Sequence, residues 1–170
     1  FEAPHASTSI VYGEVEIAGG ENGRAVATCP SGTIVTGGGF NAYPTGDLLP
    51  YVSSRTETGE AWYSWAKNLT RSTRTHQAFA VCLSGTGGST RSVLSLPVWL
   101  SPGASSGVKP ECGYGEVVTS GGYGSNDEIN VYSSWGPRSM VQIVQNEWWI
   151  DAVSTSSTTD RYFWGTVTCA

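Results

Sequence analysis

The chain has 170 residues, of which 39% are hydrophobic, 11% aromatic and 14% charged, and its formal net charge is −5. This aromatic content argues against a disordered chain, no apolar run approaches the ~20 residues of a membrane span, and the acidic balance argues against a nucleic-acid partner. Thr, Ser, Gly, Val and aromatic residues outnumber Leu, Ala, Glu, Lys and Met, which favours strands over helices. Composition therefore predicts a soluble, acidic, all-β protein.

The four cysteines indicate an oxidising compartment. Cys29, Cys82, Cys112 and Cys169 are widely spaced and form no CxxC pair, and the chain has only 2 His residues. A zinc site would need clustered Cys and His ligands, whereas an even number of distant cysteines is typical of disulfides in secreted proteins. The first residues lack an initiator Met, which we interpret as a mature chain after removal of a secretion signal. We predict a secreted protein without a metal or cofactor.

An internal repeat organises the chain. The segment 29–40, CPSGTIVTGGGF, aligns with the segment 112–123, CGYGEVVTSGGY, at an offset of 112 − 29 = 83. Further on, Ser53-Ser54 aligns with Ser133-Ser134, Trp62-Tyr63 with Trp148-Trp149, and Val81-Cys82 with Thr168-Cys169. Each unit thus has an early and a late cysteine. The simplest pairing is Cys29 with Cys82 and Cys112 with Cys169, although four cysteines allow three connectivities and pairing between units stays open.

Short strands separated by turn residues follow along both units. In chain order we expect strands at 11–17, 24–29, 33–38, 49–55, 61–67 and 75–83, then at 98–100, 107–112, 116–120, 129–134, 140–153 and 162–169. The predicted organisation is an N-terminal arm at 1–10, a β unit at 11–84, a Gly/Ser/Thr-rich linker at 85–95 and a second β unit at 96–170. Six short strands in each unit favour two β-sandwich-like repeats, each held by its disulfide.

The pattern Cys-Pro-x-Gly-x-x-Val-x-Gly-Gly-Gly from Cys29, followed by Ser53-Ser54, Trp62 and a closing Val81-Cys82, resembles a module of bacterial secreted proteins. Similar modules are found at the ends of collagen-like and phage-tail-associated chains. The second copy departs from the pattern, with Gly113 in place of Pro and Ser120 in place of the first Gly. The resemblance covers both units, implies a secreted β module associated with surfaces or tips, and brings no catalytic residues.

Catalytic and metal-binding patterns are weak. The triplet Gly37–Gly39 lacks the Lys and the helix of a phosphate-binding loop, and we interpret it as a bulge or a close backbone approach. His76 is the one plausible general base, but its strand register directs it toward the core. Asp47 with Asp127-Glu128 offers oxygen ligands for Ca²⁺ without a recognisable loop. The sequon at Asn68 is interpreted as a chance match, and we predict no enzyme activity.

The aromatic residues carry the functional prediction. Successive strand residues face opposite sides, and we place Trp62 and Trp148 in the core. We expect the outer faces to carry the ligand- or partner-binding residues, which are Tyr63, Trp65, Trp99, Trp135, Trp149 and Trp164. Flat CH-rich sugar faces stack on such rings, and the same rings anchor protein interfaces.

The predicted function is therefore extracellular recognition of a glycan or a protein partner. The first alternative is a self-assembling subunit of an extracellular filament or surface complex that joins its neighbours through residues 1–10 and its edge strands. The second alternative is an inhibitor of secreted hydrolases that presents a disulfide-framed loop.

Overall fold

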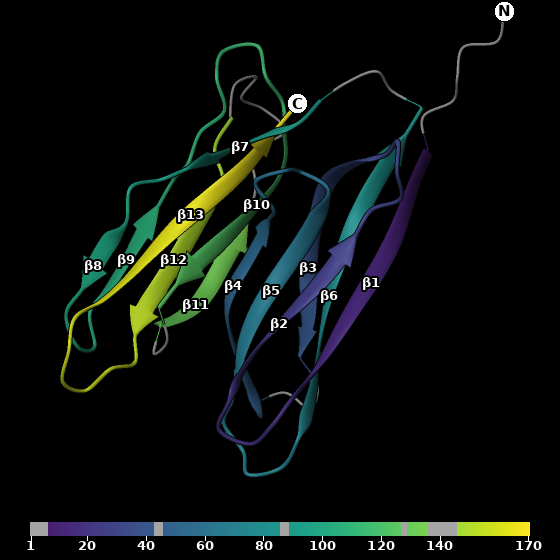
Figure 1. Cartoon of the computed structure of the whole chain (residues 1–170). Helices are drawn as coiled ribbons and strands as arrows, with labels where there is room; N and C mark the ends of the chain where they lie inside the picture. The colour runs from purple at the N-terminus through teal and green to yellow at the C-terminus, as the bar shows by residue number, and fades with distance from the viewer. Residues whose placement is uncertain (1–6, 43–45, 86–88, 127–128, 136–145) are drawn as a thin grey trace, which may run out of the picture.

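The structure, a computed structural model, describes residues 7–42, 46–85, 89–126, 129–135 and 146–170 (Figure 1). These residues form an all-β protein of thirteen strands without a helix. The strands are β1 (Ser7–Ile17), β2 (Asn22–Thr28), β3 (Ile34–Ala42), β4 (Leu48–Arg55), β5 (Ala61–Asn68), β6 (Arg74–Ser84), β7 (Arg91–Leu94), β8 (Val98–Leu100), β9 (Ser105–Val108), β10 (Val118–Ser125), β11 (Ile129–Trp135), β12 (Trp149–Ser154) and β13 (Arg161–Cys169).

The two halves of the chain have the same strand order. In the first half, β1-β6-β3 packs against β2-β5-β4; in the second, β13 lies between β10 and the pair β7 and β8, and packs against β11-β12-β9. The halves are joined because β4 pairs with β10 through Ser53 opposite Tyr123 and Val52 opposite Gly124. A single seven-stranded sheet therefore runs through both halves, with β4 and β10 adjacent in Figure 1.

The first half has a core of small side chains around one tryptophan. Ala25, Ala27, Ala78 and Ala80 are fully buried and pack around Trp62. Alternate positions of β2 and β6 supply these alanines, as the period of two in a strand requires. The second half is filled by larger side chains, including Ile129, Ile150 and Phe163 at 0% exposure.

Each half contains its own disulfide. Cys29 at the end of β2 is bonded to Cys82 of β6, and Cys112 is bonded to Cys169 of β13. The predicted pairing within each unit is therefore confirmed. The bonds close loops of 53 and 57 residues, so each stabilises its half by about 4 kcal/mol in the chain-entropy model.

Glycine in β3 and β10 permits a close approach of tryptophan to the backbone. A bulge interrupts the pairing of β3 with β6 between Val35 and Gly37, as interpreted from the sequence. A Cβ atom on Gly38 would overlap the indole of Trp62, and one on Gly121 would overlap the indole of Trp148. Both indoles therefore pack directly on a glycine backbone.

Each of the two tryptophans also donates an equivalent hydrogen bond to a serine, and these bonds correct the sequence alignment by one residue. The indole N–H of Trp62 donates to Ser53 Oγ at 2.9 Å, and that of Trp148 donates to Ser134 Oγ at 2.9 Å. Ser53 thus corresponds to Ser134 rather than to Ser133, and the two strands also share a bulge, in β4 between Pro50 and Val52 and in β11 between Val131 and Ser133. Trp62 is buried as expected, whereas Trp148, also expected in the core, is only half-buried.

Several predicted elements differ from the observed ones. β1 begins at Ser7, so residues 7–10 of the expected arm are paired with β6. The expected linker at 85–95 contains β7, which pairs with β13. The strand expected at 107–112 ends at Val108, and the one expected at 116–120 runs from Val118 to Ser125. Residues 140–145 of the long strand expected at 140–153 lie outside the described residues, and β12 itself begins at Trp149.

Candidate functional site

Strand register places five residues of β2, β5, β4, β10 and β13 in one line across the seven-stranded sheet. In this order of strands, each residue is paired directly with the next one: Arg24, Trp65, Val52, Gly124 and Trp164. Opposed residues of an antiparallel pair project to the same face. The chain neighbours on either side, such as Phe163 and Tyr123, are buried in the core, so the line lies on the outer face of the sheet.

The first half contributes a cluster of three aromatic rings to this face. A bulge between Pro50 and Val52 adds Tyr51 opposite Trp65, and the two rings lie 6.4 Å apart. Tyr63 lies two residues before Trp65, and therefore on the same face. The Arg24 guanidinium lies 4.6 Å from the centre of its ring. Burial raises the pKa of the Tyr63 phenol and outweighs the opposing effect of Arg24.

The second half contributes another cluster of three. Three atoms of the Trp164 six-membered ring lie where a Cβ atom on Gly124 would be, so this ring rests on the glycine backbone. Tyr162 stacks beside Trp164 at 6.0 Å, and Trp99 of β8 lies 5.0 Å from Tyr162. Trp99 is 64% exposed, and Tyr162 and Trp164 are half-buried.

Together these two clusters form what we term the aromatic band, which consists of Tyr51, Tyr63, Trp65, Trp99, Tyr162 and Trp164. Four of its members are among the six residues expected from the sequence. Sequence reasoning missed Tyr162, although it alternates with Trp164 and could have been found from that period of two. It also missed Tyr51, which reaches this face only through a bulge that the sequence does not reveal.

The two other expected residues lie elsewhere. Trp149 is on β12 in the three-stranded sheet with β9 and β11, and Lys109 Nζ lies 4.7 Å from the centre of its ring. Trp135 pairs with Trp149 through the backbone, and its side chain lies outside the described residues. The structure therefore does not bring Trp149 into the aromatic band, and the strand β11, which contains Trp135, belongs to the same three-stranded sheet as Trp149.

His76 does not have the surroundings of a catalytic base. It is fully buried between the two sheets, and burial lowers the pKa of its imidazole to about 4. Ser64 Oγ donates to the Val52 carbonyl at 2.8 Å and accepts from His76 Nε2 at 2.9 Å. The serine hydrogen thus points away from the imidazole, and neither side chain is accessible to a substrate. The pair is structural, and His76 points into the core as its register predicted.

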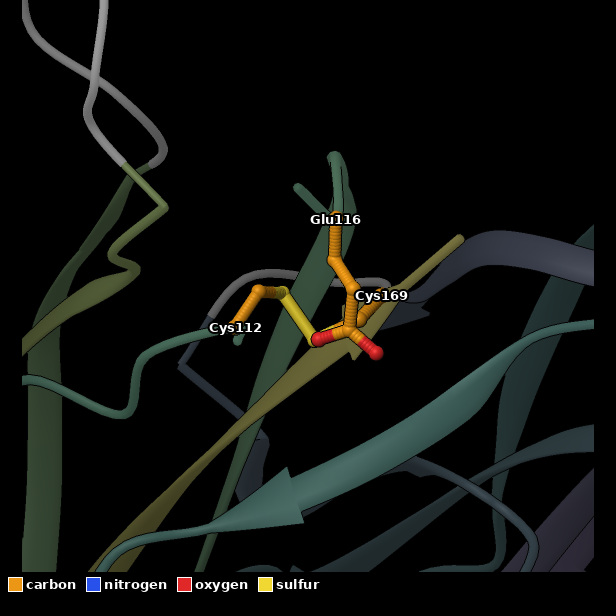
Figure 2. A group of neighbouring side chains, drawn as sticks. All are labelled: Cys112, Glu116 and Cys169. Carbon is orange, nitrogen blue, oxygen red and sulfur yellow. A yellow bond between two sulfur atoms is a disulfide. The ribbon is translucent and has the colours of Figure 1, made fainter. Parts of the chain in front are cut away.

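One group of described residues has the spacing of metal ligands, namely Cys112, Glu116 and Cys169 (Figure 2). The two sulfur atoms are joined in a disulfide and so offer no thiolate. The Glu116 carboxylate accepts hydrogen bonds from Arg91 and from the Gly113 backbone N–H, which hold its pKa below the ordinary value. This group is therefore a disulfide beside an ion pair rather than a metal site.

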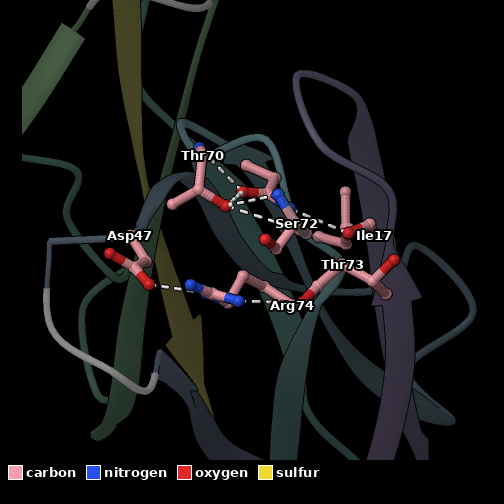
Figure 3. Close-up of polar contacts among 7 residues, drawn as sticks. Ile17, Asp47, Thr70, Ser72, Thr73 and Arg74 are labelled. Atoms are coloured by element: carbon pink, nitrogen blue, oxygen red, sulfur yellow. Dashed lines mark hydrogen bonds and ion pairs between the residues drawn. The ribbon is translucent and has the colours of Figure 1, made fainter.

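Asp47, considered above as a calcium ligand, forms an ion pair with Arg74 (Figure 3). Because Arg74 Nε donates to Asp47 Oδ2, this carboxylate oxygen already has a partner. Asp127 and Glu128, the other candidate ligands, lie outside the described residues. Nothing in the described part of the chain thus assembles the calcium site.

The sequon residue Asn68 is fully buried. Its amide nitrogen donates to the carbonyls of Ile17 and Ser72, each at 2.8 Å, and its Oδ1 accepts from the Thr70 N–H and hydroxyl. Figure 3 shows Thr70, Ser72 and Ile17 converging on this point. With both amide hydrogens donated inside the fold, Asn68 closes the turn between β5 and β6 and is not available for glycosylation in the folded protein.

Comparison with known proteins does not identify a family for this chain. No protein-family model matches the chain, and no curated protein matches it either. The resemblance to bacterial secreted modules stays a prediction. Over the residues described, no helix is long and apolar enough to cross a membrane.

Proposed function

We propose that the protein is a secreted recognition module that binds glycans through the aromatic band. The two disulfides are consistent with an extracellular or otherwise oxidising environment. Aromatic rings bind sugars because the flat, CH-rich face of a pyranose stacks on the ring face and the polar rim stays hydrated. An acidic protein with few charged residues is suited to neutral sugars rather than to polyanions.

The observation that carries this proposal is the continuous line of opposed residues from Arg24 to Trp164 on one outer sheet face. The rings are fixed in place before any ligand arrives, because each packs on a neighbouring ring, a guanidinium or a glycine backbone. Preorganised rings lose little conformational entropy on binding. A row of rings of this kind can stack on the CH-rich faces of successive sugars.

The test is affinity electrophoresis with mixed-linkage β-glucan, xylan and laminarin, followed by calorimetry on the polysaccharide that retards the protein. Trp65→Ala and Trp164→Ala should each weaken binding by roughly tenfold or more, since anchoring aromatics contribute more than about 1.4 kcal/mol. Trp149→Ala is the matched control, because Trp149 is also a half-buried tryptophan but lies on β12, in the other sheet of the second half. An equal loss of affinity in the control variant would show that binding does not depend on the aromatic band.

A second candidate, self-assembly, has its own observation. Ile10 and Tyr12 are 55% and 59% exposed on the edge strand β1, and the Tyr12 ring lies 6.4 Å from that of Phe79. An apolar edge strand is a template for pairing with another chain. Light scattering at rising concentration should show association that Ile10→Lys abolishes. A monomer at all concentrations would leave glycan binding as the sole proposal.

A further inference from the structure

The aromatic band is longer than a single sugar ring. Its members extend from β5 through β4, β10 and β13 to β8, which is four strand spacings. Neighbouring strands lie about 4.8 Å apart, so the backbones of β5 and β8 are separated by about 19 Å. A monosaccharide is too short to contact both ends of the band, which are Trp65 on β5 and Trp99 on β8.

The two clusters come from different halves of the chain. Trp65 and Tyr51 belong to the first half and Trp164 and Trp99 to the second, and only the pairing of β4 with β10 brings them onto one face. A ligand that contacts both clusters therefore lies across the junction between the halves, perpendicular to the strands.

Small residues form the middle of the band. Between Trp65 and Trp164 lie only Val52, which is 6% exposed, and Gly124, which has no side chain and is covered by the Trp164 ring. A bulkier residue at position 124 would displace that ring, because its Cβ would overlap three of the indole atoms. The glycine thus allows the Trp164 ring to extend from β13 over β10, toward the first cluster.

We infer that the ligand is an internal stretch of a linear polysaccharide that lies across the strands and contacts both ring clusters at once. This inference rests on the proposed glycan binding and narrows it to chains rather than terminal sugars. Each cluster alone binds weakly, and the linkage through the sugar chain makes the second contact effectively intramolecular. The junction of the two halves is then the centre of the binding site.

The experiment is calorimetric titration with cello-, xylo- and laminari-oligosaccharides from disaccharide to octasaccharide, chosen to match the polysaccharide bound. Affinity should rise at least ~100-fold with chain length and then level off once the chain spans both clusters. Trp65→Ala and Trp164→Ala should each reduce the affinity for the octasaccharide to nearly that for a short oligosaccharide. Trp149→Ala should leave the whole length series unchanged.

Two negative results have different meanings. If a polysaccharide binds but its disaccharide binds equally well, or if only one of the two tryptophan variants loses affinity, the ligand does not span the junction and the inference is wrong, while glycan binding stands. If none of the polysaccharides binds the intact chain, glycan binding itself fails. Near-ultraviolet circular dichroism of each variant shows that a loss of affinity is not a loss of fold.

Discussion

Replacement of His76 by leucine should remove an acid sensitivity that the burial of this imidazole creates. In the folded protein His76 is 0% exposed, and burial lowers its pKa from 6.5 to about 4. The unfolded chain binds a proton at the ordinary value, so between these two pH values the unfolded state holds more protons than the folded one. Stability contributed by neutral His76 is thus complete above pH 6.5 and is lost as the pH falls toward 4.

The size of the effect follows from the two pKa values. A shift of this extent corresponds to at most about 3 kcal/mol, and at pH 5 the loss relative to pH 8 is about 2 kcal/mol. His76→Leu has no titrating group and keeps a side chain of similar size, and Ser64 Oγ can still donate to the Val52 carbonyl. The variant should therefore be less sensitive to acid even if it is less stable at pH 8.

The assay is urea unfolding of the intact chain and of His76→Leu at pH 8, 6, 5 and 4.5. The informative quantity is the difference in unfolding free energy between the two proteins as a function of pH, because contributions of the carboxylates and of His5 cancel in it. That difference should change by about 2 kcal/mol between pH 8 and pH 5 in favour of the variant. Parallel pH profiles for the two proteins would refute the assignment of a buried, neutral His76.

Three further predictions concern stability and are each measured by urea or thermal unfolding. Gly38→Ala should cost about 3 kcal/mol, because its Cβ would overlap an indole ring and a carbonyl oxygen. Gly20→Ala, at a φ of 80° with open space around it, should cost only about 1 kcal/mol, and equal costs would contradict the packing argument. Replacing Cys29 and Cys82 by serine should cost about 4 kcal/mol; a change below 1 kcal/mol would contradict this. Asn68→Ala should cost about 2–4 kcal/mol through the loss of the four hydrogen bonds of this side chain, whereas a neutral effect would show that the turn does not depend on it.

The sequence by itself determined the structural class and the side of the strand on which Trp62 and His76 lie, whereas the structure decided between the possible disulfide pairings. The class and the side of the strand are local properties: residue composition selects strands, and the period of two assigns each side chain to one face of its own strand. Four members of the aromatic band could be named for the same reason, since they alternate with core residues.

Only the tertiary structure decided which outer faces become one surface. Trp65 and Trp164 are far apart in sequence, and their alignment depends on the pairing of β4 with β10. Their alternation with core residues is the same whichever strands are neighbours, so it cannot predict this pairing. The bulge that adds Tyr51 and the strand β7 within a Gly- and Ser-rich segment have the same origin: long-range packing sets register and pairing, and overrides what the local residues favour.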